Sequence, residues 1–336
     1  MHIRTIFLLA LGALISVVGF YLAFRNVPLD GLAAYSREVN YRWSLPALIV
    51  LAVTYAVRSL RWQLLLRPIG RIPLSAAYHS IIISFMINCI LPGRVGEMAR
   101  PLILKKTEGL PFTSTLATLA AERLLDLATL LALMLLALPG ISFTTASPIA
   151  FGGYELSPAL LMRLARTSII GALLLMLGLF FIGHNGVRQR LFFLIRRITA
   201  YARILGPRWQ TRITHATETF IITFLQRFAD GLQYLSKPGH LLVMIALSMS
   251  TWVLNALSFY LVARGCPGIG LSFADILVMM VIICLFIALP SVPGYWGLWE
   301  AAGVFALAGL GIAREPAAGF TLFNHALQIL PVIPAG

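Results

Sequence analysis

Three charged side chains that could do chemistry follow a break in an apolar stretch of the chain. Pro92 and Gly93 interrupt the stretch, and Arg94, Glu97 and Arg100 come after them at steps of three residues. This spacing places the three charges along one side of a helix. Backbone N–H groups that are free at the start of a helix favour an anion. The pattern therefore predicts a binding site for an anionic group, with phosphate as the first candidate.

A second group of charges lies in the next apolar segment and consists of Glu122, Arg123 and Asp126. Glu122 and Asp126 are one helical turn apart, so their carboxylates share a helix face. We expect this group to lie against the first one, which leaves a small excess of positive charge near the break. The sequence leaves an alternative open, in which the two groups form a closed set of ion pairs that only holds the hairpin together.

The Pro-Gly break recurs in the last third of the chain, where Pro293, Gly294 and Gly297 precede Glu300. The pattern Pro-Gly-x-x-Gly thus occurs twice, each time inside an apolar region, and in the first copy its last glycine is Gly96. Glu300 could be a proton-coupling carboxylate, or it could accept hydrogen bonds from backbone donors at the start of a helix.

The predicted substrate site joins both breaks and the second group of charges. Its residues are Asn88, Pro92, Gly93, Arg94, Gly96, Glu97, Arg100, Glu122, Arg123, Asp126, Pro293, Gly294, Gly297 and Glu300. Aromatic side chains at the second break, Tyr295, Trp296 and Trp299, could line an acyl or prenyl chain. They could instead form part of the aromatic belt at a membrane interface.

Other polar side chains in apolar surroundings have simpler explanations. Arg58 and Arg61 share a helix face near the end of an apolar segment, and their long side chains could snorkel to the interface or contact a headgroup. His79 and His325 are single histidines that we interpret as hydrogen-bonded core residues. Asp275 is placed to cap the helix that begins there. We therefore leave these five residues outside the predicted site.

The composition identifies the chain as an integral membrane protein. Hydrophobic residues make up 59% of its 336 positions and charged residues only 11%, and the mean hydropathy is +0.89. Soluble domains carry about 25% charged residues. The net charge of +14 comes from basic residues that cluster between apolar segments, as the positive-inside rule describes. This distribution disfavours nucleic acid as a partner and favours an anionic lipid surface.

The charged residues inside apolar segments are energetically costly in a bilayer, because a charge at mid-membrane costs about 2.5–3.5 kcal/mol on insertion scales. Such residues persist where they pair with each other or face a watery cavity. Non-helical backbone is likewise tolerated inside a membrane only where protein buries it or water reaches it. Both Pro-Gly breaks are therefore expected to lie next to protein or to a water-filled cavity.

The apolar segments predict an all-α integral membrane protein with about six transmembrane helices and two re-entrant hairpins. At 1.5 Å per residue, the segments expected to cross the membrane are 3–24, 45–66, 112–138, 160–182, 241–263 and 320–333. The two regions that contain the breaks, 74–104 and 273–312, are each expected to enter and leave on one side. Basic residues near the start favour a cell (inner or plasma) membrane with both termini cytoplasmic. The first segment is expected to be retained rather than removed as a signal peptide.

The order of these segments predicts an internal repeat within a single polytopic domain over 1–336. A crossing, a broken hairpin and another crossing occur in 45–138 and again in 241–333, and the two copies start on opposite sides. Inverted repeats with discontinuous helices are typical of transporters, with the substrate site between the breaks. The basic cytoplasmic segment 184–238 separates the copies. Its arginines at 188–212 predict interfacial helices on anionic lipid, or a purely topological role.

The motifs also carry a resemblance to a known family. In order, they are Asn-Cys-Ile-Leu-Pro-Gly-Arg-Val-Gly-Glu-Met-Ala-Arg from 88 to 100, Glu-Arg-x-x-Asp from 122 to 126 and Pro-Gly-x-x-Gly-x-x-Glu from 293 to 300. The chain resembles the flippase-like transmembrane family named for the membrane region of lysylphosphatidylglycerol synthase. The resemblance implies movement of a lipid between leaflets, by a stand-alone member without the soluble aminoacyltransferase domain. Such members are similar to proteins linked with hopanoid or glycolipid pathways.

The leading hypothesis is a translocase that moves an anionic, glycosylated or isoprenoid-type lipid, with its headgroup bound between the two hairpins. The sequence has no Gly-x-x-x-x-Gly-Lys-[Ser/Thr] phosphate loop, so a gradient or mass action would drive the movement. We expect no metal, cofactor or catalytic residue. Two alternatives stay open, an integral-membrane enzyme acting on a prenyl- or glycerophospholipid and a scaffold for a lipid-modifying complex. A second copy of the chain or a lipid-biosynthesis protein is a candidate partner.

Overall fold

The computed structural model describes residues 3–92, 94–137, 149–151, 154–156, 223–289 and 292–336, with a few isolated positions between 167 and 197. The helices up to residue 137 are α1 (Ile3–Phe24), α2 (Leu29–Glu38), η1 (Tyr41–Trp43), α3 (Ser44–Leu66), α4 (Leu74–Ile90), α5 (Val95–Thr107) and α6 (Phe112–Ala137). The later ones are α10 (Thr223–Leu232), η5 (Gln233–Ser236), α11 (Pro238–Gly265), α12 (Phe273–Phe286), η6 (Pro293–Tyr295), α13 (Leu298–Gly309), α14 (Arg314–Ile329) and α15 (Val332–Ala335).

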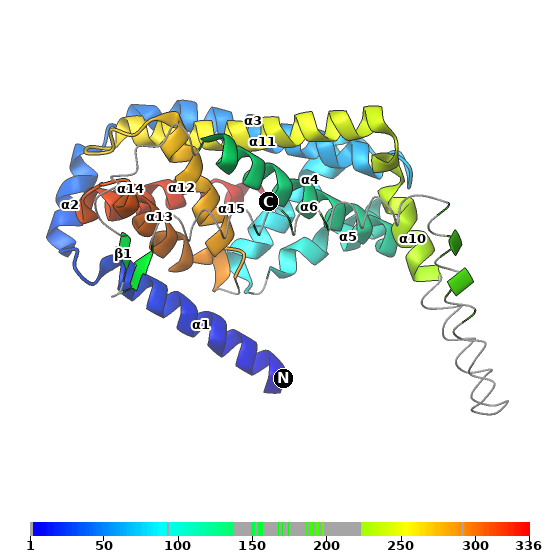
Figure 1. Cartoon of the computed structure of the whole chain (residues 1–336), viewed down its shortest axis with the longest axis horizontal. Helices are drawn as coiled ribbons and strands as arrows, with labels where there is room; N and C mark the ends of the chain where they lie inside the picture. Colours follow the sequence, from blue (N-terminus) through cyan, green and yellow to red (C-terminus); the bar gives the residue numbers. More distant parts are fainter. Residues whose placement is uncertain are drawn as a thin grey trace.

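The fold is that of a helical membrane protein, as the sequence predicted (Figure 1). The described strands are the short antiparallel pair β1 (Ile149–Phe151) and β2 (Tyr154–Leu156). Two described helical segments are each long and apolar enough to cross a bilayer, Tyr41–Leu66 and Pro238–Gly265. A third candidate span is the pair formed by α1 and α2, which is bent by 75°. The number of six crossings therefore stays a prediction.

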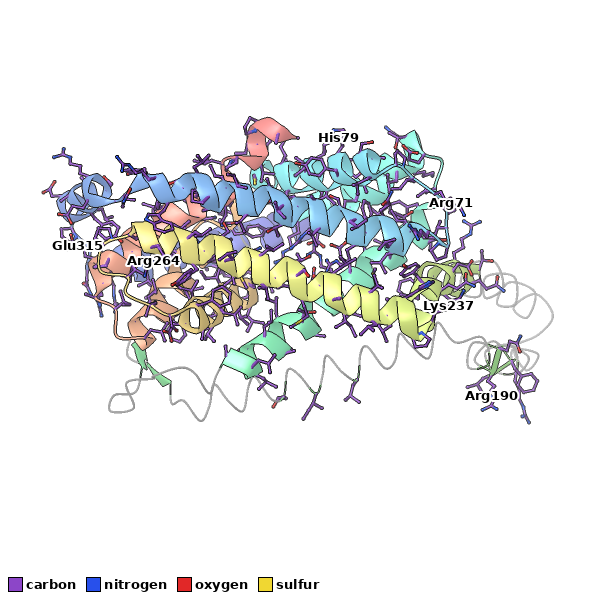
Figure 2. All side chains as sticks on the ribbon, turned by 90° about the horizontal axis from the view of Figure 1, so that it is seen from above. Arg71, His79, Arg190, Lys237, Arg264 and Glu315 are labelled. Atoms are coloured by element: carbon purple, nitrogen blue, oxygen red, sulfur yellow. The ribbon has the colours of Figure 1, made fainter. Side chains whose placement is uncertain are left out.

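The long helices α3 and α11 lie side by side and run in opposite directions (Figure 2). Lys237 before α11 and Arg71 after α3 are at one end of the pair, and Arg264 is at the other end. The N–H of Asn40 donates to the Gly265 carbonyl at 2.8 Å, which ties the start of one helix to the end of the other. The first helices of the two proposed repeats thus pack antiparallel, as an inverted repeat requires.

Each of the two broken regions forms a pair of packed helices. The first pair is α4 and α5, and the second is α12 and α13. Helix α4 ends at Ile90 because Leu91 precedes a proline, which disfavours helical backbone at that position, and Leu91 is extended with φ −109° and ψ 141°. Gly93 lies outside the described residues. The breaks between these helices are present as predicted, and their re-entrant position in a membrane stays a prediction.

The core of the second half surrounds α12. This helix is apolar along nearly its whole length, and all residues from Ile276 to Val281 are buried. A helix that is hydrophobic on every side is stable only when it is enclosed, and α6, α11 and α13 pack around this one. Its start is fixed by Ser272 and Asp275, whose side chains and backbone N–H groups form a reciprocal cap. The predicted capping role of Asp275 is confirmed.

The predicted boundaries between the repeats fall largely on the undescribed part of the chain. The expected crossing 160–182 and the basic stretch 188–212 lie outside the described residues, apart from isolated positions. Two of these positions, Arg190 and Arg197, are exposed. The division into two half-repeats and a basic interfacial segment therefore stays a prediction.

Candidate functional site

The tips of the two broken hairpins meet beside a cavity in the middle of the described helices. The cavity has a volume of about 240 Å³, far more than the roughly 10–15 Å³ that a single water requires. Helices α3, α6, α11, α14 and α15 complete its wall, and most of the lining is aliphatic or aromatic. The charged lining residues are Arg58, Arg94, Glu97, Arg123 and Asp126. A cavity of this composition offers both apolar and ionic contacts.

Arg94 connects the first break to the second. It precedes α5 in the left-handed backbone conformation, with φ 56°. Its Nη2 donates a hydrogen bond to the carbonyl of Ile287, just after α12. Its guanidinium carbon also lies 5.6 Å from the centre of the Tyr295 ring, within cation–π range. The two breaks, which are far apart in the sequence, are therefore joined through one side chain.

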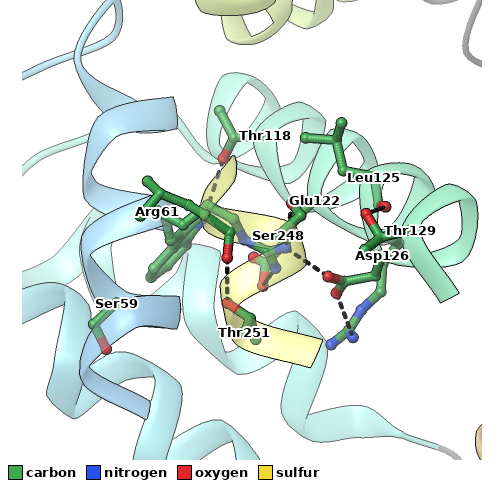
Figure 3. Close-up of polar contacts among 12 residues, drawn as sticks. Ser59, Arg61, Thr118, Glu122, Leu125, Asp126, Thr129, Ser248 and Thr251 are labelled. Carbon is green, nitrogen blue, oxygen red and sulfur yellow. Dashed lines mark hydrogen bonds and ion pairs between the residues drawn. The ribbon is translucent and has the colours of Figure 1, made fainter. Parts of the chain in front are cut away.

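A buried ion-pair network lies next to the cavity (Figure 3). Arg61 of α3 contacts Glu122 at 3.0 Å and Asp126 at 2.6 Å, and Arg100 of α5 contacts Glu122 at 2.9 Å. Arg61 also donates to the Ser248 hydroxyl of α11 at 2.8 Å. All four charged side chains are at most 5% exposed. Because each buried charge is compensated by the others, this network fastens α3, α5, α6 and α11 together.

A second, more accessible set of ion pairs faces the cavity. Glu97 lies 3.1 Å from Arg123 and 3.8 Å from Arg94, and Arg123 is also 3.7 Å from Asp126. Arg94, Glu97 and Arg123 are 20–35% exposed. These longer contacts between half-exposed groups are weak and can be exchanged for contacts with a ligand.

The structure thus brings the two predicted groups of charges together. Some of these residues line the cavity, and the others belong to the buried ion-pair network. Arg94, Glu97, Arg123 and Asp126 line the cavity. Arg100 does not line it, although we expected it to share a ligand with Arg94. Its side chain is fully buried against Glu122 and the rings of Trp62 and Phe85. Glu122 is enclosed in the same way, so both predicted alternatives, a charged cavity and a closed lock, are present side by side.

The expectation that Arg58 and Arg61 snorkel to the interface is wrong. Arg61 is fully buried and Arg58 is 5% exposed. Arg61 pairs with both Glu122 and Asp126 and was missed by sequence reasoning, because arginines near the end of an apolar helix usually reach water. Trp252 was also missed, and its Nε1 donates to Asp126 at 3.0 Å. The sequence feature that could have pointed to Arg61 was the helix face that it shares with Arg58.

Asn88 and Gly96 hold the two arms of the first hairpin together. The side-chain oxygen of Asn88 accepts a hydrogen bond from the N–H of Gly96 at 2.8 Å. A Cβ on Gly96 would collide with the carbonyl oxygen of Ser84 and with Asn88 itself. Glycine is therefore required for the close approach of α5 to α4, and Asn88 satisfies a donor at the start of α5.

The second break is closed by an acid–imidazole pair. Glu300 accepts from the N–H of Gly297 at 2.7 Å, and its other oxygen lies 2.5 Å from Nδ1 of His325. Nε2 of His325 lies 2.9 Å from the Gly294 carbonyl oxygen, and the ring stacks on Trp299 with a centroid distance of 4.5 Å. Since a carbonyl can only accept, Nε2 is the donor in the contact with Gly294, and Nδ1 is left to share a hydrogen bond with Glu300.

The structure shows a helix-start role for Glu300 and a core position for His325, and proton coupling by Glu300 stays a prediction. Both side chains are fully buried, and neither lines the cavity. Glu300 is a helix-start residue that satisfies a backbone donor, and His325 is a hydrogen-bonded core residue, as we expected for a single histidine. Tyr295 and Trp299 do line the cavity. Pro293 opens η6 and starts the irregular turn that carries these groups.

Helix α1 packs against the second break. The hydroxyl of Ser16 accepts from the N–H of Val292 at 3.2 Å. Gly297 has φ 89°, a conformation that favours glycine, and a Cβ there would collide with the Ser16 carbonyl oxygen. Both the backbone conformation and the contact with α1 therefore favour glycine at position 297.

Among the described residues, no three His, Cys, Asp or Glu side chains lie together in a way that could hold a metal ion. The groups that the cavity offers are guanidinium, carboxylate, amide, hydroxyl and indole groups. They can bind and orient a polar group by hydrogen bonds and charge. Aliphatic and aromatic side chains of the same wall can contact a hydrocarbon chain.

The chain is similar to known proteins over nearly all or part of its length. The chain matches a model of the family described as lysylphosphatidylglycerol synthase TM region over residues 9–336. It is 25% identical over 323 residues to a UPF0104 membrane protein of Methanothermobacter thermautotrophicus, a match that covers 92% of this chain and 85% of that protein. It is also 31% identical over 99 residues to glycosyltransferase AglD of Haloferax volcanii, covering 29% of this chain and 16% of that protein. No solved structure matches the chain.

Proposed function

The chain belongs to the lysylphosphatidylglycerol synthase transmembrane-region family of multi-pass membrane proteins, and on this premise we propose that it moves a lipid between membrane leaflets. A membrane lipid combines a polar headgroup with apolar tails. The cavity between the broken hairpins combines ionic side chains with an apolar wall. The headgroup would bind there while the tails stay in the bilayer.

The main support for this proposal is that the two breaks contact each other beside the cavity. Arg94 bonds to the carbonyl of Ile287 and lies over Tyr295, so it closes the passage between the hairpins. In transporters built from inverted repeats, the substrate site lies between discontinuous helices, and one repeat moves against the other around it. Exchange of the Arg94 contacts for a headgroup would let α4 and α5 separate from α12 and α13.

The antiparallel arrangement of α3 and α11 supports the orientation that we propose in the membrane. The half-repeats 45–138 and 241–333 would enter the bilayer from opposite leaflets, and the tips of their hairpins would meet near its centre. Both termini would lie in the cytoplasm of a cell (inner or plasma) membrane. The basic stretch 188–212 would then rest on anionic lipid, or serve only to keep its loop inside.

The candidate substrates are an anionic glycerophospholipid and a lipid with a glycosylated or isoprenoid-type structure. The partial likeness to a protein named glycosyltransferase AglD supports the second kind. The same likeness supports the alternative that the chain acts as an enzyme on a lipid, or as a scaffold for one. Formation of a new product from labelled lipid by the purified protein would favour the enzyme.

The test is a leaflet-exposure assay in vesicles that contain the purified protein and a fluorescent phosphatidylglycerol. Arg94→Ala and Glu97→Gln should slow exposure by about tenfold or more, equal to at least roughly 1.4 kcal/mol in the barrier. Arg71→Gln removes an exposed positive charge away from the cavity and serves as the matched control. Unchanged lipid movement in both cavity variants would remove this site from the mechanism.

A further inference from the structure

Arg58 is a buried cation that faces the cavity without a counter-charge. It is 5% exposed and lines the cavity from α3. In the part of the chain that the structure describes, it makes no ion pair, and its Nε has no hydrogen-bond partner. The other four arginines of this region are each paired with a carboxylate: Arg61, Arg94, Arg100 and Arg123.

A buried, uncompensated charge is unfavourable unless something else in the functional state balances it. Two aromatic rings give Arg58 partial compensation, because its guanidinium carbon lies 5.5 Å from the ring centre of Phe85 and 5.4 Å from that of Trp252. These contacts hold the planar group between rings from α4 and α11. They leave its N–H donors without an acceptor, and a guanidinium fork matches the oxygens of a phosphate.

The charge balance of the lining limits what the cavity can accept. Three guanidinium groups line it, those of Arg58, Arg94 and Arg123, together with the two carboxylates of Glu97 and Asp126. Asp126 also pairs with the fully buried Arg61, so at least one positive charge of the lining has no carboxylate partner of its own. A phosphodiester, which carries a single negative charge, would neutralise that charge.

Besides Nε of Arg94 and Arg123 and Oδ2 of Asp126, two uncharged lining side chains have atoms without hydrogen-bond partners within the described residues. The side-chain oxygen of Asn255 is an unused acceptor and Nε1 of Trp299 is an unused donor, and both atoms are buried. A hydroxyl group donates one hydrogen bond and accepts others, so it can satisfy both kinds of group. An ammonium group could satisfy only the acceptor, and it would add a positive charge to a site that already has one in excess.

We propose, on the basis of the proposed function, that Arg58 is the residue that binds the phosphate and that the cavity takes a lipid phosphodiester with an uncharged, hydroxyl-bearing headgroup. Arg94 and Arg123 are tied to Glu97, so they can contact the headgroup only when these ion pairs open, whereas Arg58 has no ion pair to break. A glycerophospholipid with a polyol headgroup and an isoprenoid phosphodiester of a sugar share this chemistry.

The experiment measures thermal unfolding of the purified full chain in detergent, with phosphatidylglycerol as the probe. A ligand that binds the folded state stabilises it by RT ln(1 + L/Kd), where L is the ligand concentration, so the dependence of the midpoint temperature on ligand concentration gives an apparent Kd. Arg58→Met should weaken phosphatidylglycerol by about 10- to 100-fold, the usual range for a lost hydrogen bond to a charged group. Arg71→Gln should leave the apparent Kd unchanged.

Stability without lipid separates a binding role from a structural one. Since Arg58→Met replaces an uncompensated buried charge by an apolar side chain of similar length, it should keep or raise the lipid-free midpoint temperature. Arg58→Gln repeats the test with a polar side chain in case the methionine variant does not fold. An unchanged apparent Kd for phosphatidylglycerol in either folded variant would overturn the proposal.

Three further probes define the ligand. Diacylglycerol has the same tails without a phosphate and should give no shift, whereas a shift equal to that of phosphatidylglycerol would overturn the role of the anion. Phosphatidylethanolamine should bind at least tenfold more weakly, and equal binding would overturn the uncharged headgroup. A shift with inorganic phosphate alone that matches phosphatidylglycerol would identify a free-phosphate site and overturn the assignment to a lipid.

The two proposals can fail separately. If Arg94→Ala stops lipid movement while Arg58→Met binds phosphatidylglycerol normally, the proposed function stands and Arg58 is not the phosphate-binding residue. If phosphatidylglycerol binds through Arg58 but the wild-type protein does not move it between leaflets, the site stands and translocation fails.

Discussion

The two Pro-Gly breaks have similar sequences but are fastened by different chemistry. The first break carries half-exposed ion pairs, in which Glu97 lies between Arg94 and Arg123 at the cavity. The second is closed by Glu300 and His325, both fully buried, at a distance of 2.5 Å. Weak, accessible ion pairs exchange easily with water or a ligand, whereas a buried pair with satisfied hydrogen bonds does not.

Under the proposed function, this difference assigns separate roles to the two hairpins. The first would supply the charged groups that exchange with a ligand, and the second would provide the fixed wall that Arg94 contacts. Behind the first break, the network around Glu122 is as closed as the second break. The ion pairs of Glu97 are therefore the exchangeable set of charges, whereas the network around Glu122 and the Glu300–His325 pair are two fixed sets. Variants in these three sets should differ in their effects on protein stability and on lipid transport.

The largest loss of stability is expected from Glu122→Ala. The change leaves Arg61 and Arg100 buried without their shared carboxylate, and removal of one member of a buried ion pair costs about 3–5 kcal/mol. Unfolding of the purified protein by heat or denaturant measures the loss. Glu38→Ala, at an exposed carboxylate on α2, should change stability little. A loss for Glu122→Ala no larger than that of this control would show that the network does not hold the helices.

A smaller loss is expected from Glu300→Ala, about 2–3 kcal/mol, because the N–H of Gly297 and Nδ1 of His325 lose their buried partner. Glu300→Gln is the matched control, since an amide can accept from Gly297 and donate to His325. It should retain most of the stability in the same unfolding measurement. Equal losses in the two variants would mean that charge, rather than hydrogen bonding, closes the second break.

Gly96→Ala should destabilise the first hairpin by about 1–3 kcal/mol, the range for overpacking a tight contact. The added Cβ would push against the Ser84 carbonyl and Asn88 and separate α5 from α4. Gly239→Ala is the control, because a Cβ at Gly239 would meet no atom within 4 Å. If both variants are equally stable, the close approach of the two arms is not required.

The smallest effect on stability is expected from Glu97→Gln. Its ion pairs are half-exposed, so the loss should be within about 1 kcal/mol and should shrink further at high salt. Lipid movement in the leaflet-exposure assay should nevertheless fall. A destabilisation as large as that of Glu300→Ala would abolish the distinction between an adjustable first break and a fixed second one.

Much of the arrangement of the fold could be predicted from the sequence. The interruptions at Pro92 and Pro293 and the approach of the charges after Gly96 to Glu122 and Asp126 follow from proline chemistry and from the cost of isolated charges in a membrane. Helix α12 is enclosed as its uniformly apolar sequence indicates. These features depend on local sequence and on rules that apply to every membrane protein.

What could not be predicted depends on contacts between distant segments. Arg61 stands near the end of α3, where arginines usually reach water, and only the packing of α6 and α11 around it encloses its charge. The pairing of His325 with Glu300 joins two helices whose relative position is not set by either sequence alone. The buried position of Arg58 could not be predicted for the same reason, since the cavity that it faces is lined by residues of α3 to α6 and of α11 to α15.

The contact between Ser16 and the second break has a consequence for how the protein is made. The two sides of the hydrogen bond from Val292 to Ser16 are 276 residues apart. At about 5–20 residues per second, translation separates their emergence from the ribosome by on the order of 10–60 s. Helix α1 must therefore wait in the bilayer, beside lipid or an insertion factor, until the residues around Val292 have been synthesised. Assembly of the second break thus follows the insertion of α1 by many seconds.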